Sequence, residues 1–169
     1  MSGVYTDENM TCQIDLRAAI WSTDKLNVEY KAIGNFLSDV DWIAETDNEV
    51  FLIEYKNACT KKAQNPIAFK EKIKTEDFCD RILKKYYGSV FYMLACGKRK
   101  PFNLICVIEA PLLDSFMRKK AQASIKKRLP FELQENPEIT IKLIKDFKVV
   151  SITEWNREYP AFPLIARPQ

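Results

Sequence analysis

The sequence contains three copies of an acidic residue followed two positions later by lysine, and one of them lies where it could do chemistry. The copies are Glu29-Tyr30-Lys31, Glu54-Tyr55-Lys56 and Asp146-Phe147-Lys148. Because 23 acidic residues and 19 lysines produce such tripeptides by chance, only the surrounding sequence gives one of them a meaning. Glu54 and Lys56 end the apolar run Val50–Ile53, which reads as a buried strand. Side chains two positions apart share one face of a strand, so both charged groups are expected beside the core, where an unpaired charge is costly.

A two-residue turn at Asp47-Asn48 predicts how this strand pairs with the preceding one, Val40–Glu45. In that register Asp41 faces Glu54 and Asp39 faces Lys56. Directly opposed side chains point to the same side of a hairpin, with Cβ atoms about 4.5–5.5 Å apart. Two carboxylates this close repel each other unless a cation lies between them, and lysine or a hard ion such as Mg²⁺ meets that need.

A structural interpretation of the same residues stays open. Acid–lysine pairs on a hairpin are commonly solvated ion pairs that contribute about 0–1 kcal/mol. Asp39 is equally explained as a partner of Lys56. Glu29 is either a further site residue from a neighbouring strand or an exposed carboxylate.

Composition narrows the chemistry further. The chain has no histidine, which excludes a Ser-His-Asp triad, a Cys-His dyad and a histidine-ligated zinc ion. Its five cysteines are odd in number, widely spaced and without a C-x-x-C pair, as in reduced, structural thiols of a cytoplasmic protein. No segment has the length and hydrophobicity of a signal peptide or a membrane span. With 169 residues, 47% of them hydrophobic, we expect a single domain over residues 1–169.

The hydrophobic pattern predicts an α/β (α+β) fold, a mixed sheet flanked by helices in the order α-β-β-β-α-β followed by α-β-β. Thr75 is the expected N-cap of the long helix, Gly97 its C-terminal glycine, and Asn65-Pro66 the start of a shorter helix. The other expected elements are helices at Thr11–Ser22 and Pro111–Arg128, strands at Asn27–Ile33, Val40–Glu45, Val50–Lys56, Phe102–Ile108, Ile139–Lys145 and Lys148–Ile152, and a helical turn near Trp155.

The stretch from Ser38 to Ile43 with Phe51 to Lys56 resembles the PD-(D/E)XK nuclease superfamily, which includes restriction endonucleases, Holliday-junction resolvases and RecB-type exonucleases. The resemblance covers about 100 residues, and its specific part is under 20. It implies a restriction endonuclease-like core and a hydrolase acting on DNA with Mg²⁺ or Mn²⁺. Asp41 and Glu54 match the metal-binding carboxylates, and Lys56 matches the lysine that positions or activates the attacking water. No proline precedes Asp41, and Asp15 is the one acid that the expected first helix offers to the site.

Basic residues are clustered although the net charge is only +3. Such clusters suit a phosphate backbone, and a solvated helix face is the alternative. The expected DNA contacts are Lys61, Lys62, Lys98, Arg99 and Lys100.

The leading hypothesis is therefore a magnesium-dependent deoxyribonuclease, as a homodimer or directed to its substrate by a partner protein. One alternative is a catalytically inactive module of the same fold that binds nucleic acid or protein. The other is an unrelated α+β interaction protein, which requires the predicted hairpin register to fail.

Overall fold

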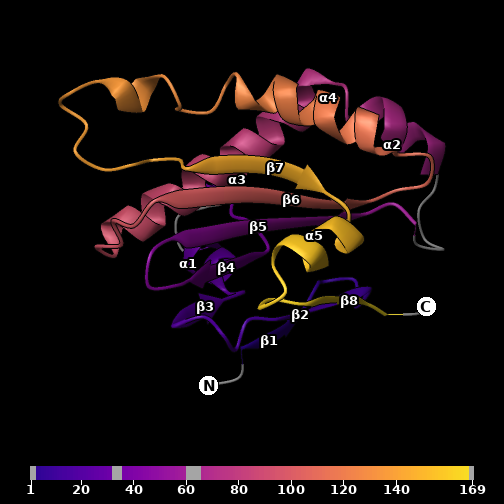
Figure 1. Ribbon diagram of the computed structural model, residues 1–169, viewed down its shortest axis with the longest axis horizontal. Coiled ribbons are helices and arrows are strands. Elements are labelled where there is room, and N and C mark those ends of the chain that lie inside the picture. Colours follow the sequence, from indigo (N-terminus) through magenta and orange to yellow (C-terminus); the bar gives the residue numbers. More distant parts are fainter. Residues whose placement is uncertain (1–2, 32–35, 60–65, 168–169) are drawn as a thin grey trace.

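A mixed sheet of five strands forms the centre of the molecule (Figure 1). The computed structural model describes residues 3–31, 36–59 and 66–167. The first three strands of the sheet are antiparallel, and the last two run parallel to the third. In sheet order the strands are β3 (Trp21–Thr23), β4 (Trp42–Glu45), β5 (Val50–Asn57), β6 (Phe102–Glu109) and β7 (Asp146–Val150). The expected mixed α/β architecture is confirmed.

Different elements cover the two faces of this sheet (Figure 1). One face carries helices α1 (Leu26–Lys31), α3 (Glu76–Ala95) and α4 (Ser115–Lys126), and α2 (Pro66–Lys72) links β5 to α3. The other face carries α5 (Ile152–Glu158) and a small antiparallel sheet of β1 (Val4–Thr6), β2 (Cys12–Asp15) and β8 (Leu164–Ala166). A 3₁₀ turn, η1 (Leu133–Glu135), follows α4. None of the described helices has the length and hydrophobicity to cross a membrane.

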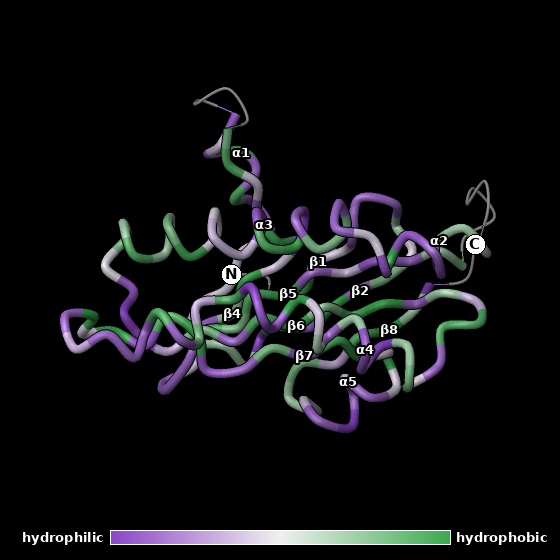
Figure 2. The backbone as a smooth tube through the Cα atoms, turned by 90° about the horizontal axis from the view of Figure 1, so that it is seen from above, coloured by the Kyte–Doolittle hydropathy of each residue, from purple (hydrophilic) through white to green (hydrophobic). Residues whose placement is uncertain are grey.

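The alternation of side chains along β5 builds two cores. Leu52 packs on the helical side with α3, whereas Phe51 and Ile53 pack on the other side with Trp155 of α5. Hydrophobic residues accordingly run along the central strands (Figure 2). A strand covered on both faces reads as a continuous apolar run, which is why β5 and β6 were recognisable in the sequence.

The predicted hairpin register is confirmed. Ile43 pairs with Leu52 and Glu45 with Val50 across β4 and β5, and the Thr46 N–H closes the turn on the Glu49 carbonyl at 2.9 Å. Glu54 therefore shares the helical side of the sheet with Leu52.

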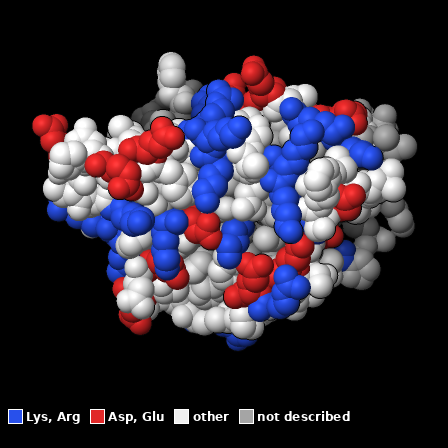
Figure 3. Space-filling view, turned by 45° about the horizontal axis from the view of Figure 1, so that its top comes forward, with Lys and Arg blue, Asp and Glu red and all other residues white. Residues whose placement is uncertain are grey.

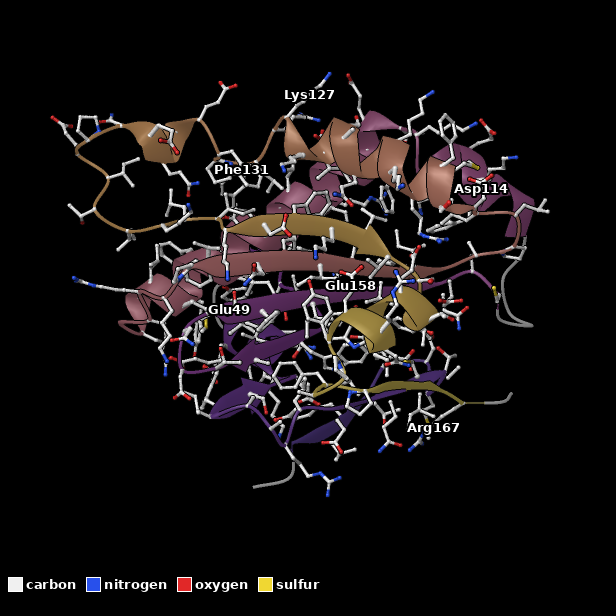
Figure 4. All side chains as sticks on the ribbon, viewed as in Figure 1. Glu49, Asp114, Lys127, Phe131, Glu158 and Arg167 are labelled. Carbon is white, nitrogen blue, oxygen red and sulfur yellow. The ribbon has the colours of Figure 1, made fainter. Side chains whose placement is uncertain are left out.

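The helix ends follow the expected capping chemistry. Thr75 caps α3 by accepting the Phe78 N–H, and Gly97 follows the helix with a φ of 75°. The expected helix at Pro111–Arg128 is shorter, because the Asp114 side chain caps α4 and starts it at Ser115 (Figure 4). α5 surrounds Trp155 as predicted, and Asn65 lies outside the described residues.

Three sequence predictions were wrong. Residues 11–22 form β2, a turn and β3 instead of a helix, because Cys12, Ile14 and Leu16 are all buried and alternate with a period of two. The strand expected at Asn27–Ile33 is helix α1 over its described part: Leu26 and Tyr30, four residues apart, are buried while Val28 is 56% exposed.

The third error concerns Ile139–Lys145, which is irregular. The adjacent strand β6 begins at Phe102, and its first partner on β7 is Asp146, paired with Asn103. The Lys145 N–H still donates to the Phe102 carbonyl at 2.7 Å, whereas residues 139–144 pair with no strand of the described chain. Element order differs accordingly: α1 lies between β3 and β4, and no helix precedes the antiparallel strands among the residues that the structure describes.

Candidate active site

The hairpin brings the three predicted site residues together at one end of β5. The Lys56 ammonium lies 2.5 Å from Glu54 Oε1, and the Glu54 side chain is 0% exposed. Asp41, just before β4, accepts the Tyr55 backbone N–H on Oδ2 at 2.7 Å. Asp41 is therefore tied to the strand that carries the other two residues.

A fourth residue, Lys85 of α3, joins the two carboxylates. Its ammonium donates to Glu54 Oε2 at 2.8 Å and lies 3.6 Å from Asp41 Oδ1. Lys85 was not among the predicted site residues. Its signal was a charged residue on the buried stripe of a helix, three residues after Ile82 and four before Ser89.

Electrostatics couple these groups tightly. Burial, and then the charge of Asp41, raises the pKa of Glu54 against the opposing effect of Lys56 and Lys85. Burial acts to lower the pKa of Lys85, but the carboxylates of Glu54 and Asp41 outweigh it, and the pKa is raised. Burial also raises the pKa of Asp39, beside Asp41. Two carboxylates and two ammonium groups leave this cluster with no formal net charge.

α3 also positions the backbone before β4. A Cβ atom on Gly88 would lie 2.1 Å from the Ser38 carbonyl oxygen, so the helix approaches this segment as closely as only glycine allows. The next residue, Ser89, accepts the Val40 N–H at 3.1 Å, and Tyr30 donates its hydroxyl to the Gly88 carbonyl. Gly88 in the middle of the helix therefore serves close packing beside Asp41.

Two pockets of opposite charge meet at Lys56 and Lys85, which line both. The basic pocket, about 440 Å³, lies on the Glu54 side and takes in cationic side chains of α2 and α3. The acidic pocket, about 340 Å³, lies on the Asp41 side. Apart from the two shared lysines, the charged residues are Glu54, Lys72, Arg81 and Lys84 in the basic pocket, and Asp7, Glu8, Asp24, Asp39 and Asp41 in the acidic pocket.

The two carboxylates have the chemistry of a magnesium site with few protein ligands. No group of three or more acids or cysteines within the described ranges is close enough to enclose a metal ion. Mg²⁺ is commonly held by one or two carboxylates together with waters and substrate phosphate, so Asp41 and Glu54 suffice. Buried Glu54 Oε1, although 2.5 Å from Lys56 Nζ, receives no hydrogen bond of normal geometry from the described part of the chain. The donor set therefore fits such an ion, which would have to replace the Lys85 ammonium between the carboxylates.

The other predicted contacts lie elsewhere. Lys98 and Lys100 bind Glu45 at the opposite end of β4, about 13 Å along the strand from Asp41, and Arg99 between them is exposed. Lys61 and Lys62 lie outside the described residues. Asp15 pairs with Arg17 in the small sheet, and Glu29 is exposed on α1, so neither lines the two pockets.

Charge on the helical side is mixed. Basic side chains run in bands across the face that includes α4, with acidic side chains between them (Figure 3). On α4, Arg118 binds Glu154 of α5 at 3.1 Å, and the Arg128 guanidinium after the helix binds Asp80 at 2.7 Å. These two arginines have structural partners, as does Arg81 of the basic pocket, whose guanidinium lies 3.0 Å from the Asp77 carboxylate.

No protein-family model, curated protein or solved structure matches the chain.

Proposed function

We propose that this protein is a metal-dependent deoxyribonuclease of the PD-(D/E)XK type. The observation that carries the proposal is the convergence of Asp41, Glu54 and Lys56 with Lys85 at the meeting point of a basic and an acidic pocket. A buried carboxylate beside a second, half-buried one is costly to a fold, and the position of Glu54 and Asp41 where two pockets meet favours a catalytic use.

The fold around the site supports the same proposal. Three antiparallel strands, a helix and a parallel strand occur in the order that the resemblance implies, within the longer series β3-α1-β4-β5-α2-α3-β6. There are two departures: α1 lies between the first two strands, and no helix precedes β3 in the part of the chain that the structure describes.

In the proposed reaction Asp41 and Glu54 would hold a divalent ion, and Lys85 is the group that keeps the two carboxylates together without it. When bound, the ion would lower the pKa of its water and offset charge on the phosphoryl oxygens. Lys56, 37% exposed and common to both pockets, places a positive charge where a phosphate would develop negative charge. Lys72, Arg81 and Lys84 would contact neighbouring phosphates of the substrate.

A second candidate function is a non-catalytic DNA-binding module of the same fold. The observation in its favour is that Lys56 and Lys85 already neutralise both carboxylates without a metal ion.

The two candidates differ in one assay. Purified protein is incubated with linear single-stranded and duplex DNA in Mg²⁺, in Mn²⁺ and in EDTA. The variants are Asp41→Asn, which keeps an oxygen to accept the Tyr55 N–H, and Glu132→Gln, a control on an exposed residue near η1. We expect metal-dependent cleavage that Asp41→Asn abolishes and Glu132→Gln preserves. Binding without cleavage in every metal would favour the module, and neither binding nor cleavage would refute both.

A further inference from the structure

The charges on the two sides of Lys56 and Lys85 are fully segregated. Beyond the shared lysines, the basic pocket adds three cations, Lys72, Arg81 and Lys84, and its single acid is the buried Glu54. The acidic pocket adds five carboxylates and no further cation among the described residues. A smaller cavity of about 150 Å³ continues the acidic side, where Asp7 and Glu8 lie beside Asp41 and Lys56.

A polyanion that passes through the site would have to cross both pockets. Phosphates are attracted on the basic side, but on the other side they would lie among Asp7, Glu8, Asp24 and Asp39. The negative phosphates and these carboxylates would repel each other, and salt screens this repulsion least in a partly enclosed pocket. A metal ion on Asp41 and Glu54 would leave these four carboxylates facing only two cations, Lys56 and Lys85, in the described lining of this pocket. The chain of phosphates therefore has a favourable path on one side only.

The basic pocket also has apolar walls. Phe69 of α2 lines the pocket and is partly exposed, with its ring packed edge to face on Phe78 of α3 at a centroid distance of 6.0 Å. Phe78 and Ile82 also belong to the lining, but they are 4% and 1% exposed and are part of the core. Lysines that follow a backbone, combined with an accessible aromatic ring such as Phe69, are typical of single-strand sites, where an unpaired base stacks on the ring. Bases within a duplex have no free face for such stacking.

We propose that the basic pocket holds the end of a single DNA strand and that the acidic pocket blocks its continuation, so that the enzyme removes nucleotides from strand ends. The inference rests on the proposed nuclease function. Glu8 and Asp24 act here through their charge alone: no hydrogen bond or ion pair links their side chains to the described residues. Asp7 differs, because its carboxylate accepts the Thr11 and Cys12 N–H groups at 2.6 Å and holds the β1–β2 turn.

The test compares a linear single strand with a covalently closed single-stranded circle of the same sequence, in Mn²⁺. We expect stepwise loss of nucleotides from the linear strand and cleavage of the circle at least 100-fold slower. In EDTA, fluorescence anisotropy should show tighter binding of the linear strand. Cleavage of both forms at similar rates would overturn the inference and leave the nuclease standing, whereas cleavage of neither would refute the nuclease itself.

A charge reversal tests whether the acidic pocket is the cause. The double variant Glu8→Lys/Asp24→Lys should improve binding and cleavage of the circle at least 10-fold relative to the linear strand. Its control, Glu132→Lys/Glu135→Lys, makes the same change of charge at η1, at the end of the molecule away from α2 (Figure 1). If the pocket variant keeps the wild-type preference for linear DNA, or the control changes it equally, the proposal is wrong.

Discussion

Two buried glutamates on the same hairpin are each bound by two lysines, yet their surroundings give them opposite properties. Glu45 of β4 is 3% exposed and meets Lys98 at 2.5 Å and Lys100 at 2.9 Å. Glu54 of β5 is 0% exposed and meets Lys56 at 2.5 Å and Lys85 at 2.8 Å.

The pKa values separate the two. Burial acts to raise the pKa of Glu45, but hydrogen bonds from Lys98 and Lys100 overcome it and the pKa is lowered. At Glu54 burial prevails, the Asp41 charge adds to it, and the pKa is raised. The two lysines at Glu45 therefore stabilise its charged form and hold that end of the hairpin together. At Glu54 the additional carboxylate of Asp41 removes the surplus of positive charge that the two lysines leave at Glu45, so this end suits the binding of a further cation.

The largest expected contrast is catalytic. Lys56→Ala and Lys98→Ala each remove one of two ammonium groups from a buried glutamate. We expect Lys56→Ala to lower the rate of DNA cleavage at least 100-fold, the effect of losing one transition-state charge contact, while Lys98→Ala stays within about 3-fold of wild type. Binding of DNA in EDTA should change little in either variant, because backbone affinity is spread over many cations. Equal rates for the two variants would place Lys56 in a structural role.

That contrast was partly visible in the sequence. The register followed from the Asp47-Asn48 turn and the continuous apolar run of β5, which left few ways to pair the strands. Lys85 was beyond reach because its contact with Glu54 spans 31 residues and depends on how α3 crosses the sheet. The acidic pocket was hidden for the same reason, since Asp7 and Glu8 belong to a segment that forms part of a separate small sheet.

The secondary structure was predicted wrongly in short segments whose apolar residues fit both the helical spacing and the strand spacing. In residues 11–22, Ile14 and Ala18 satisfy a helical spacing, while Cys12, Ile14 and Leu16 satisfy the strand spacing that burial selects. The long helix α3 had twenty residues, a cap and a glycine stop, and so left no such ambiguity.

Gly88 within α3 and Gly97 just after its end allow the same comparison, between a position at the site and a position away from it, for the backbone. Gly88→Ala would place a methyl group 2.1 Å from the Ser38 carbonyl, so we expect a loss of about 1–3 kcal/mol in unfolding free energy and at least 10-fold in cleavage rate as the Asp41 segment shifts. Gly97→Ala has free space but a φ of +75°, and should cost about 1 kcal/mol with cleavage unchanged. Chemical denaturation and assays on folded protein separate the two effects. A Gly88 variant that is destabilised but fully active would refute the positioning role.

The effect of Mn²⁺ on the melting temperature should distinguish Lys85, which binds Glu54, from Lys100, which binds Glu45. Lys85→Met should lower the unfolding free energy in EDTA by about 1–3 kcal/mol, since it leaves Glu54 short of one partner. Millimolar Mn²⁺ should then raise the melting temperature of this variant more than that of the wild type, because no ammonium competes for the carboxylates. Lys100→Met should be destabilised without such rescue. A Mn²⁺ shift that persists in Lys85→Met/Asp41→Asn would show that the ion binds elsewhere.

The smallest expected effect is on stability at different pH values, and its sign differs between the glutamates. A lowered pKa means that Glu45 stabilises the fold above its ordinary value of 4.5, and that this contribution is lost as the pH falls through the folded value. Glu45→Gln should therefore cost about 1 kcal/mol at pH 7 and less at pH 3. A raised pKa means the reverse for Glu54: the folded state gains most when this carboxyl is protonated, and the gain is lost as the pH rises through the folded value.

Glu54→Gln, an uncharged replacement, should thus be neutral or stabilising at pH 7 in EDTA, and the difference from wild type should shrink as the pH falls. Urea unfolding of both variants and the wild type at pH 7, 5 and 3 measures these signs directly. The comparison depends on Asp41, so the combined variant Asp41→Asn should remove most of the stabilisation by Glu54→Gln. If Glu54→Gln destabilises the protein at pH 7 as Glu45→Gln does, both glutamates stabilise the fold in their charged form. The proposed difference between a lowered pKa at Glu45 and a raised pKa at Glu54 would then be wrong.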